Sequence, residues 1–203
     1  MSLVPPNKKI LWIDTETGGT EPKTDALLQL AALIEVEGEI VDEINLKMQP
    51  FKNKVVSVDA IKTNGLSMEK IKTFEKPEKA YMHFYDFLSK HGKRKNKAER
   101  FVMAGYNSDF DCRFLSQWFE DISGGPYAYW DFLQFSPIDP LSTIRGMRYG
   151  GVIDIPNTML ETCCDYFGIK IDAHDALSDI RATRELTHIV FSRLWDGWSK
   201  TDF

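Results

Sequence analysis

The sequence predicts a single α/β domain, in which a meander of strands is followed by helices that alternate with further strands. Three observations support this class: three strand-like segments stand in succession near the N-terminus, helical spacing dominates the remainder, and a buried strand-like segment at 101–105 interrupts it. The 203 residues are 43% hydrophobic, enough for one sizeable core, and no linker-like seam divides them. We therefore predict one domain over 1–203, with a core from 8 to 194.

The first third of the chain contains the predicted meander. Residues 9–13 form a short apolar run, and residues 27–36 and 39–48 form a hairpin that turns at Glu37 and Gly38. From 57 to 90 the spacing of apolar residues becomes helical, with two short helices split at Asn64–Gly65 and a longer helix after Pro77.

The remaining elements alternate. Residues 101–105 predict a buried strand, 109–122 a helix, 137–139 the end of another strand, 158–167 a helix that ends at Gly168, and 175–194 a long final helix. The predicted order is therefore three strands, helices, a strand, a helix, a strand and two helices.

Charge and cysteine content exclude several functional classes. The formal net charge is −5, so a general polyanion-binding surface is not indicated, and a nucleic acid would be held locally or through metal ions. Cys112, Cys163 and Cys164 fit neither a disulfide framework nor a zinc site, which predicts a reducing, cytoplasmic environment. No run approaches the roughly 20 apolar residues of a membrane helix, so we expect a soluble protein.

Two carboxylates, Asp14 and Glu16, follow the first strand in the stretch ILWIDTETGGT. Side chains at positions i and i+2 of a strand share a face, so the two anions lie close together and each raises the free energy of ionising the other. A positive group between them would remove this repulsion.

The predicted helix 109–122 carries a third acid on its apolar face. Asp111 aligns with Phe114, Leu115 and Trp118, whereas Asp109 aligns with polar positions. A carboxylate on a buried stripe costs several kcal/mol unless it is paired or binds a metal ion.

The final predicted helix repeats this pattern. Asp179 aligns with Thr183, Leu186 and Val190 on an inward stripe, and His174 lies just before the helix. Asp175 has the position of a helix N-cap, which favours a structural role for it.

Each of these residues alone has an ordinary structural reading, as a turn or cap residue, as a partner of an arginine, or as a core or surface histidine. Together they place four carboxylates at one strand end and two inward helix faces, with no cysteine or second histidine to suit zinc. Oxygen ligands of this kind are typical of Mg²⁺ or Mn²⁺ sites.

Three stretches, IDTETGG, YNSDFDCRFL and HDALSDIRAT, resemble in chain order the three motifs of the DnaQ-like (DEDDh) 3'-to-5' exonucleases, and the resemblance runs from about Lys8 to Leu194. KTDALLQLAA is also similar to the corresponding segments of ribonuclease T and of the proofreading subunit of bacterial DNA polymerase III. The resemblance implies a ribonuclease H-like fold, a mixed five-stranded sheet with helices on both faces. One departure is Tyr106, where many members have histidine before Asn107.

The resemblance also implies roles for individual residues. Asp14, Glu16, Asp111 and Asp179 match the acids that bind two divalent cations, Mg²⁺ or Mn²⁺, and His174 matches the general base. Glu16, Thr17, Gly18 and Asn107 are the expected substrate-binding residues, and Gly18 with Gly19 is expected to let the backbone approach a terminal nucleotide. The implied reaction releases nucleoside 5'-monophosphates.

The residues and the resemblance are compatible with three functions. The first is a 3'-to-5' exonuclease on single-stranded DNA or frayed ends, alone or with a DNA polymerase partner; the second is an exoribonuclease that trims RNA. The third is an inactive exonuclease fold kept as a binding module, which the presence of all four acids and the histidine disfavours. Because the chain stops soon after the last helix, we expect a free-standing nuclease, monomeric or homodimeric, and the basic segment 93–97 is a candidate for binding phosphates upstream.

Overall fold

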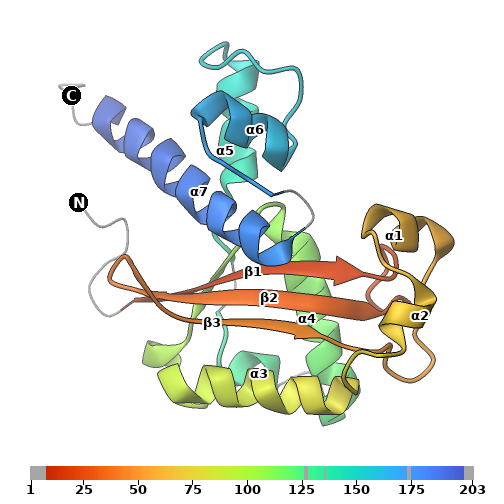
Figure 1. Cartoon of the computed structure of the whole chain (residues 1–203). Coiled ribbons are helices and arrows are strands. Elements are labelled where there is room, and N and C mark those ends of the chain that lie inside the picture. The colour runs from red at the N-terminus through yellow and green to blue at the C-terminus, as the bar shows by residue number, and fades with distance from the viewer. Residues whose placement is uncertain (1–7, 126–127, 135, 173–174, 199–203) are drawn as a thin grey trace.

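The computed structural model describes residues 8–125, 128–134, 136–172 and 175–198. Figure 1 shows a twisted sheet with helices on both of its faces. The strands are β1 (Lys9–Thr17), β2 (Leu27–Val36), β3 (Glu39–Lys47) and β4 (Val102–Ala104), in the spatial order β3-β2-β1-β4. Neighbours in the meander β1-β2-β3 are antiparallel, and β4 is parallel to β1.

Seven helices complete the described part of the chain, together with two 3₁₀ turns at Lys97–Glu99 and Tyr129–Asp131. The helices are α1 (Val58–Thr63), α2 (Met68–Ile71), α3 (Pro77–His91), α4 (Ser108–Ser123), α5 (Pro140–Tyr149), α6 (Leu160–Phe167) and α7 (Ala176–Trp198). None of the helices in these described ranges is both long and apolar enough to cross a membrane.

The predicted hairpin and the α/β class are confirmed. The connection between β2 and β3 has φ values of 54° at Glu37 and 90° at Gly38, and positive φ at two successive residues is typical of tight β-hairpin turns. The two short helices split at Asn64–Gly65 are present as α1 and α2, and Gly168 ends α6 with a positive φ of 73°.

The predicted fifth strand is not a continuous element in the described residues. Leu133 and Ile138 each form an isolated parallel bridge, to Phe101 and Ala104 respectively. Between them Ser136 has a φ of 64°, and Pro137 has no N–H to donate. The chain therefore follows the edge of β4 without forming a continuous ladder, and the sheet has four described strands where five were predicted.

Two further elements differ from the prediction. Strand β1 continues past Ile13 to Thr17, because the polar stretch that follows the apolar run keeps its pairing with β2. Helix α5 was not predicted, although Asp139 accepts a hydrogen bond from the N–H of Leu141 as its N-cap and Pro140 occupies the first turn.

The sheet separates two apolar layers. Leu11 and Ile13 of β1 pack toward α3 and α4 in the largest core cluster. Ile10 and Trp12, which alternate with them, pack on the opposite face against Ala176 and Ile180 of α7. This alternation follows from the two-residue period of a strand, and it places Asp14 and Glu16 on the α7 face.

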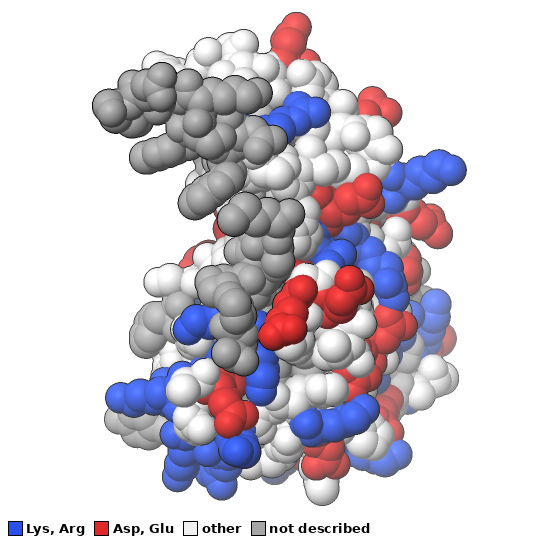
Figure 2. Space-filling view, turned by 90° about the vertical axis from the view of Figure 1, so that its left-hand side faces the viewer, with Lys and Arg blue, Asp and Glu red and all other residues white. Residues whose placement is uncertain are grey.

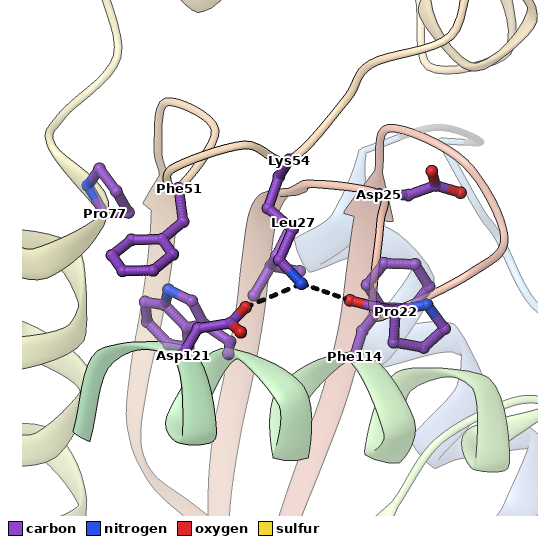
Figure 3. A pocket seen from close by; sticks show the side chains of 9 residues that line it. Pro22, Asp25, Leu27, Phe51, Lys54, Pro77, Phe114 and Asp121 are labelled. Carbon is purple, nitrogen blue, oxygen red and sulfur yellow. Dashed lines mark hydrogen bonds and ion pairs between the residues drawn. The ribbon is translucent and has the colours of Figure 1, made fainter. Parts of the chain in front are cut away.

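A buried lysine joins the loop after β1 to α4. The ammonium of Lys54, whose side chain is 8% exposed, lies 2.9 Å from a carboxylate oxygen of Asp121 and donates to the carbonyls of Pro22 and Lys23 at 2.7 and 2.8 Å. Figure 3 shows this ammonium between the loop and the helix, beside the rings of Phe51 and Phe114. All three of its donor positions are thus matched by acceptors.

We predict that Lys54→Met lowers the free energy of unfolding by about 1 to 3 kcal/mol, because the carboxylate and two carbonyls lose their donor in a poorly solvated place. Urea denaturation measures this change. The control is Lys79→Met, which removes an exposed ion pair with Glu75 at 2.6 Å and should leave the free energy of unfolding nearly unchanged. Equal effects of the two substitutions would contradict the structural role of Lys54.

Candidate active site

The site begins on β1, where two acids share the face that α7 covers. In the antiparallel register Asp14 lies opposite Ala31 and Glu16 lies opposite Gln29. Both acids are partly buried, and Thr15 between them points toward α4. The predicted common face of Asp14 and Glu16 is therefore confirmed.

Asp111 reaches the same strand because β4 is short. The parallel pairing of β4 with β1 ends at Ala104, which lies beside Trp12, so α4 can begin next to Asp14 and Thr15. Thr15 donates its hydroxyl hydrogen to Asp111 at 2.7 Å, and the Asp111 side chain is buried. The turn into α4 needs a residue without Cβ, since a Cβ on Gly105 would lie 2.9 Å from the carbonyl oxygen of Ile13.

Asp109 has the solvent-facing position that the helical pattern predicted. Its carboxylate accepts a hydrogen bond from Arg113 at 3.0 Å one turn along α4, and both side chains are exposed. Positions i and i+2 of a helix lie on different faces, so Asp109 and Asp111 have different environments.

Asp139 fixes the start of α4, a role that the sequence did not predict. Its carboxylate accepts hydrogen bonds from the backbone N–H groups of Asn107 and Ser108 at 3.2 and 3.1 Å, while it also caps α5. Asn107 is exposed and left-handed, with a φ of 59°. The Asp139–Pro140 dipeptide is a sequence signal for a helix start, but nothing local reveals that it caps a second helix.

Asp179 approaches the β1 acids from α7. This residue is partly buried in the first turn of the helix, and Thr183, Leu186 and Val190 on the predicted inward stripe are buried. Asp175 accepts a hydrogen bond from the backbone N–H of Ser178 at 3.1 Å, which confirms its predicted capping role. The predicted base His174 lies outside the described residues.

Burial and neighbouring carboxylates raise the pKa values of two of the four acids. The pKa of Asp14 is raised well above its ordinary value, first by burial and then by the charges of Asp111, Glu16 and Asp179. Burial, together with the charge of Glu16, raises the pKa of Asp111 to about 7, although hydrogen bonds from Thr15 act in the opposite direction. The cluster therefore resists full ionisation at neutral pH.

This set of donors fits hard divalent cations. It consists of carboxylate oxygens from β1, α4 and α7, the ligand type that Mg²⁺ and Mn²⁺ prefer. Within the described ranges, no group of three or more His, Cys, Asp or Glu side chains is already closed into a metal-holding arrangement. The fold therefore brings the acids from β1, α4 and α7 to one region without closing three of them into such a group.

The backbone after β1 is held by the chain itself. The side-chain amide of Asn64 donates to the carbonyl of Thr17 at 2.9 Å, and the N–H of Gly18 donates to the carbonyl of Ala26 at 2.7 Å. A Cβ on Gly18 would lie 2.5 Å from the carbonyl oxygen of Val55. Glycine at this position is therefore explained by packing against Val55, a reason that lies outside the local sequence.

The basic segment 93–97 lies at the opposite end of the sheet. Lys9, the first residue of β1, donates to the carbonyl of His91 and pairs with Glu99, which places the segment near the start of β1. Arg94 pairs with Asp131 at 2.6 Å, and Lys93 lies 3.5 Å from Glu99. Figure 2 shows this end of the molecule, where acidic side chains lie among the basic ones. A role of the segment in phosphate binding stays a prediction, with a solvated loop as the alternative.

Tyr106 has a structural role in place of the histidine found in many DnaQ-like exonucleases. Its hydroxyl donates to the carbonyl of Thr158 at 2.6 Å and lies 3.3 Å from the sulfur of Cys163. Cys112, Cys163 and Cys164 are free thiols. Tyr106 therefore links the start of α4 to the segment that carries α6.

Comparison with known proteins identifies the class of this molecule. A family model described as "Exonuclease" matches residues 11–187, a range that contains every acid of the cluster. The chain belongs to this family of DnaQ-like exonucleases and is a 3'-to-5' exonuclease.

Individual relatives agree with this assignment. The chain is similar to ribonuclease T of Haemophilus ducreyi, with 28% identity over 192 residues that cover 91% of this chain and 85% of the relative. It is also similar to ribonuclease T of Histophilus somni, with 30% identity over 184 residues that cover 86% and 79%.

The fold is similar to that of Escherichia coli exonuclease I in complex with a dT13 oligonucleotide. The TM-score is 0.75 at 22% identity, and the match covers 93% of this chain and 43% of exonuclease I. The chain therefore spans less than half the length of that enzyme, and the likeness confirms the ribonuclease H-like architecture.

The raised pKa of Asp111 predicts a specific dependence of stability on pH. Because the folded pKa is about 7, and the unfolded pKa is about 4, the folded state binds more protons between these values. The free energy of unfolding, measured by urea denaturation in EDTA, should therefore fall as pH rises through this window.

Asp111→Asn should flatten this decline, and at neutral pH the variant should exceed the wild type by on the order of 1 to 4 kcal/mol. Asp109→Asn changes an exposed acid two positions away and should follow the wild-type curve. Parallel pH curves for Asp111→Asn and the wild type would show that Asp111 is not held in an unfavourable charged state.

Proposed function

We propose that the protein hydrolyses the terminal phosphodiester bond at the 3' end of single-stranded DNA or of frayed duplex ends, and releases nucleoside 5'-monophosphates. The observation that carries the proposal is the convergence of Asp14, Glu16, Asp111 and Asp179 from one strand and two helices. Mutual repulsion makes this arrangement costly without a cation.

The four acids would hold two divalent cations, Mg²⁺ or Mn²⁺. When bound, such a pair supplies a water molecule of lowered pKa and stabilises the charge on the leaving oxygen. The charges of the other three acids all raise the pKa of Asp14. Asp14 would therefore take part in holding both cations.

His174 is proposed as the general base that takes the proton of the attacking water. A histidine has an ordinary pKa near 6.5, so it is largely neutral and able to accept a proton slightly above neutral pH. The sequence places it before α7, five positions from Asp179.

The end of β1 is proposed to recognise the 3'-hydroxyl. Glu16 and the backbone of Thr17 and Gly18 lie next to the acid cluster, and Asn64, Ala26 and Val55 hold this backbone in place. Asn107 is exposed at the start of α4, where it is available to a substrate. Backbone that is held in one position in this way favours binding of a 3' terminus over binding of an internal phosphodiester bond.

RNA is the second candidate substrate. It is favoured by the similarity over most of the chain to proteins named ribonuclease T. The fold likeness to an exonuclease bound to a DNA oligonucleotide favours single-stranded DNA. The 2'-hydroxyl distinguishes the two substrates, since it both donates and accepts hydrogen bonds.

One gel experiment tests the proposal. Oligonucleotides of DNA and RNA labelled at the 5' end, with free or phosphorylated 3' ends, are incubated with the protein and Mg²⁺ or Mn²⁺ and sampled over time. We expect a ladder that shortens stepwise from a free 3' end of DNA, and arrest by EDTA. A ladder from RNA alone would favour the second candidate, while internal cleavage or indifference to the 3' block would overturn the assigned polarity.

Matched variants complete this experiment. Asp14→Asn should abolish the ladder, because it removes an acid on which the charges of the other three act and which would hold the cations. Asp109→Asn, in an exposed pair with Arg113, should retain wild-type turnover. Turnover by Asp14→Asn at a tenth of the wild-type rate or more would contradict the assignment of the cation site.

A further inference from the structure

A second buried carboxylate lies on the α7 face of the sheet, away from the acid cluster. Glu35, near the end of β2, has 0% exposure and lies opposite Ile10 of β1. Its Oε2 atom accepts a hydrogen bond from the indole nitrogen of Trp12 at 2.9 Å and from Nε of Arg184 at 2.6 Å, and His188 Nε2 lies 3.5 Å away. The apolar strand sequence LLQLAALIEV gave no indication of this role.

Glu35 is held in its charged form. Burial alone would raise the pKa of Glu35, but hydrogen bonds from His188, Arg184 and Trp12, with the charge of Arg184, lower it to about 2. Arg184 is fixed further by donating to the carbonyl of Gly38 at 2.6 Å. A buried pair of this kind adds little stability over apolar side chains of similar volume, but it requires one particular geometry.

The partners of Glu35 come from the two elements that carry Asp14 and Asp179. Trp12 precedes Asp14 by two residues on the same face of β1, which is about 7 Å along a strand. Arg184 follows Asp179 by five residues on α7, which is about 7.5 Å along a helix. The contacts of Glu35 are therefore separated from the acid cluster by nearly the same distance along β1 as along α7.

Apart from the exposed pair of Arg181 with Glu43, the other contacts between α7 and the sheet that we describe are mainly apolar. Ala176, Ile180, Arg184 and His188 form a row at four-residue spacing, and its first two members pack on apolar residues such as Trp12. Apolar packing is non-directional, so it tolerates small shifts and rotations of a helix more readily than a hydrogen-bonded charge does.

We propose that Glu35 is a positioning residue, which fixes the axial and rotational register of α7 on β1 and β2 so that Asp179 faces Asp14. This inference rests on the proposed cation site and extends it to a residue that does not contact the cations. It predicts that loss of the link raises the concentration of metal needed by the enzyme.

The test compares Glu35→Gln with Glu43→Gln. Glu43 of β3 pairs with Arg181 of α7, so the control also removes a link between α7 and the sheet, but an exposed one. Two quantities are measured for each protein: the Kd for Mn²⁺ by isothermal titration calorimetry, and the Mn²⁺ concentration that gives half-maximal exonuclease activity.

For Glu35→Gln both quantities should rise about 10- to 100-fold, the usual cost of removing a group that orients metal ligands. For Glu43→Gln both should stay within about twofold, since exposed ion pairs contribute little. Unchanged Mn²⁺ affinity and activation in Glu35→Gln would overturn the inference.

A double variant separates positioning from stability. Glu35→Leu combined with Arg184→Leu removes both charges and fills the space with apolar groups, so the free energy of unfolding should return toward the wild-type value. If Glu35 sets the register of α7, the double variant should still need more Mn²⁺ than the wild type. Recovery of wild-type Mn²⁺ affinity together with stability would show that Glu35 serves stability alone.

The wild type separates failure of the inference from failure of the proposed function. A wild-type protein without Mn²⁺ binding or metal-dependent hydrolysis would contradict the proposed function, and the inference with it. An active, Mn²⁺-binding wild type with unaltered Glu35 variants would contradict only the role assigned to Glu35.

Discussion

Repulsion among four carboxylates is the constraint on which the rest of this structure depends. Asp14 is surrounded by Asp111, Glu16 and Asp179, and burial removes much of the water that would screen them. Such a cluster lowers the stability of the folded state at neutral pH unless a cation is bound. The rest of the fold must therefore keep β1, α4 and α7 together against this electrostatic repulsion.

Three polar links join elements of this fold. Lys54 joins the loop after β1 to α4, Asp139 binds the first N–H groups of α4, and Glu35 joins β1 and β2 to α7. Each link is formed by a charged group that accepts or donates several hydrogen bonds, and such bonds are directional. The apolar layers stabilise the sheet, while these links join it and its loops to the two helices that carry Asp111 and Asp179.

The sequence was most informative where a local pattern determines structure. The helical spacing of Asp111 and Asp179 predicted their inward faces, and the i, i+2 spacing of Asp14 and Glu16 predicted their common face. The positive φ values at Glu37 and Gly38 likewise follow from a turn that local sequence predicts.

Features that depend on distant residues were missed. The length of β1 beyond Ile13 depends on its pairing with β2, and the interrupted fifth strand depends on how the chain turns at Ser136 and Pro137. The need for glycine at position 18 arises from Val55, far along the chain. The partners of Glu35 are separated from it by up to 153 residues, so no local pattern contains them.

The central claim is that a divalent cation relieves the repulsion among the acids, and calorimetric unfolding of the wild-type protein tests it most directly. Scans at slightly alkaline pH are compared in EDTA and in a series of Mn²⁺ concentrations. The midpoint should rise steadily with Mn²⁺, because a ligand at 100 times its Kd adds about 2.7 kcal/mol to the stability of the state that binds it. A midpoint that is the same in EDTA and in saturating Mn²⁺ would contradict the account.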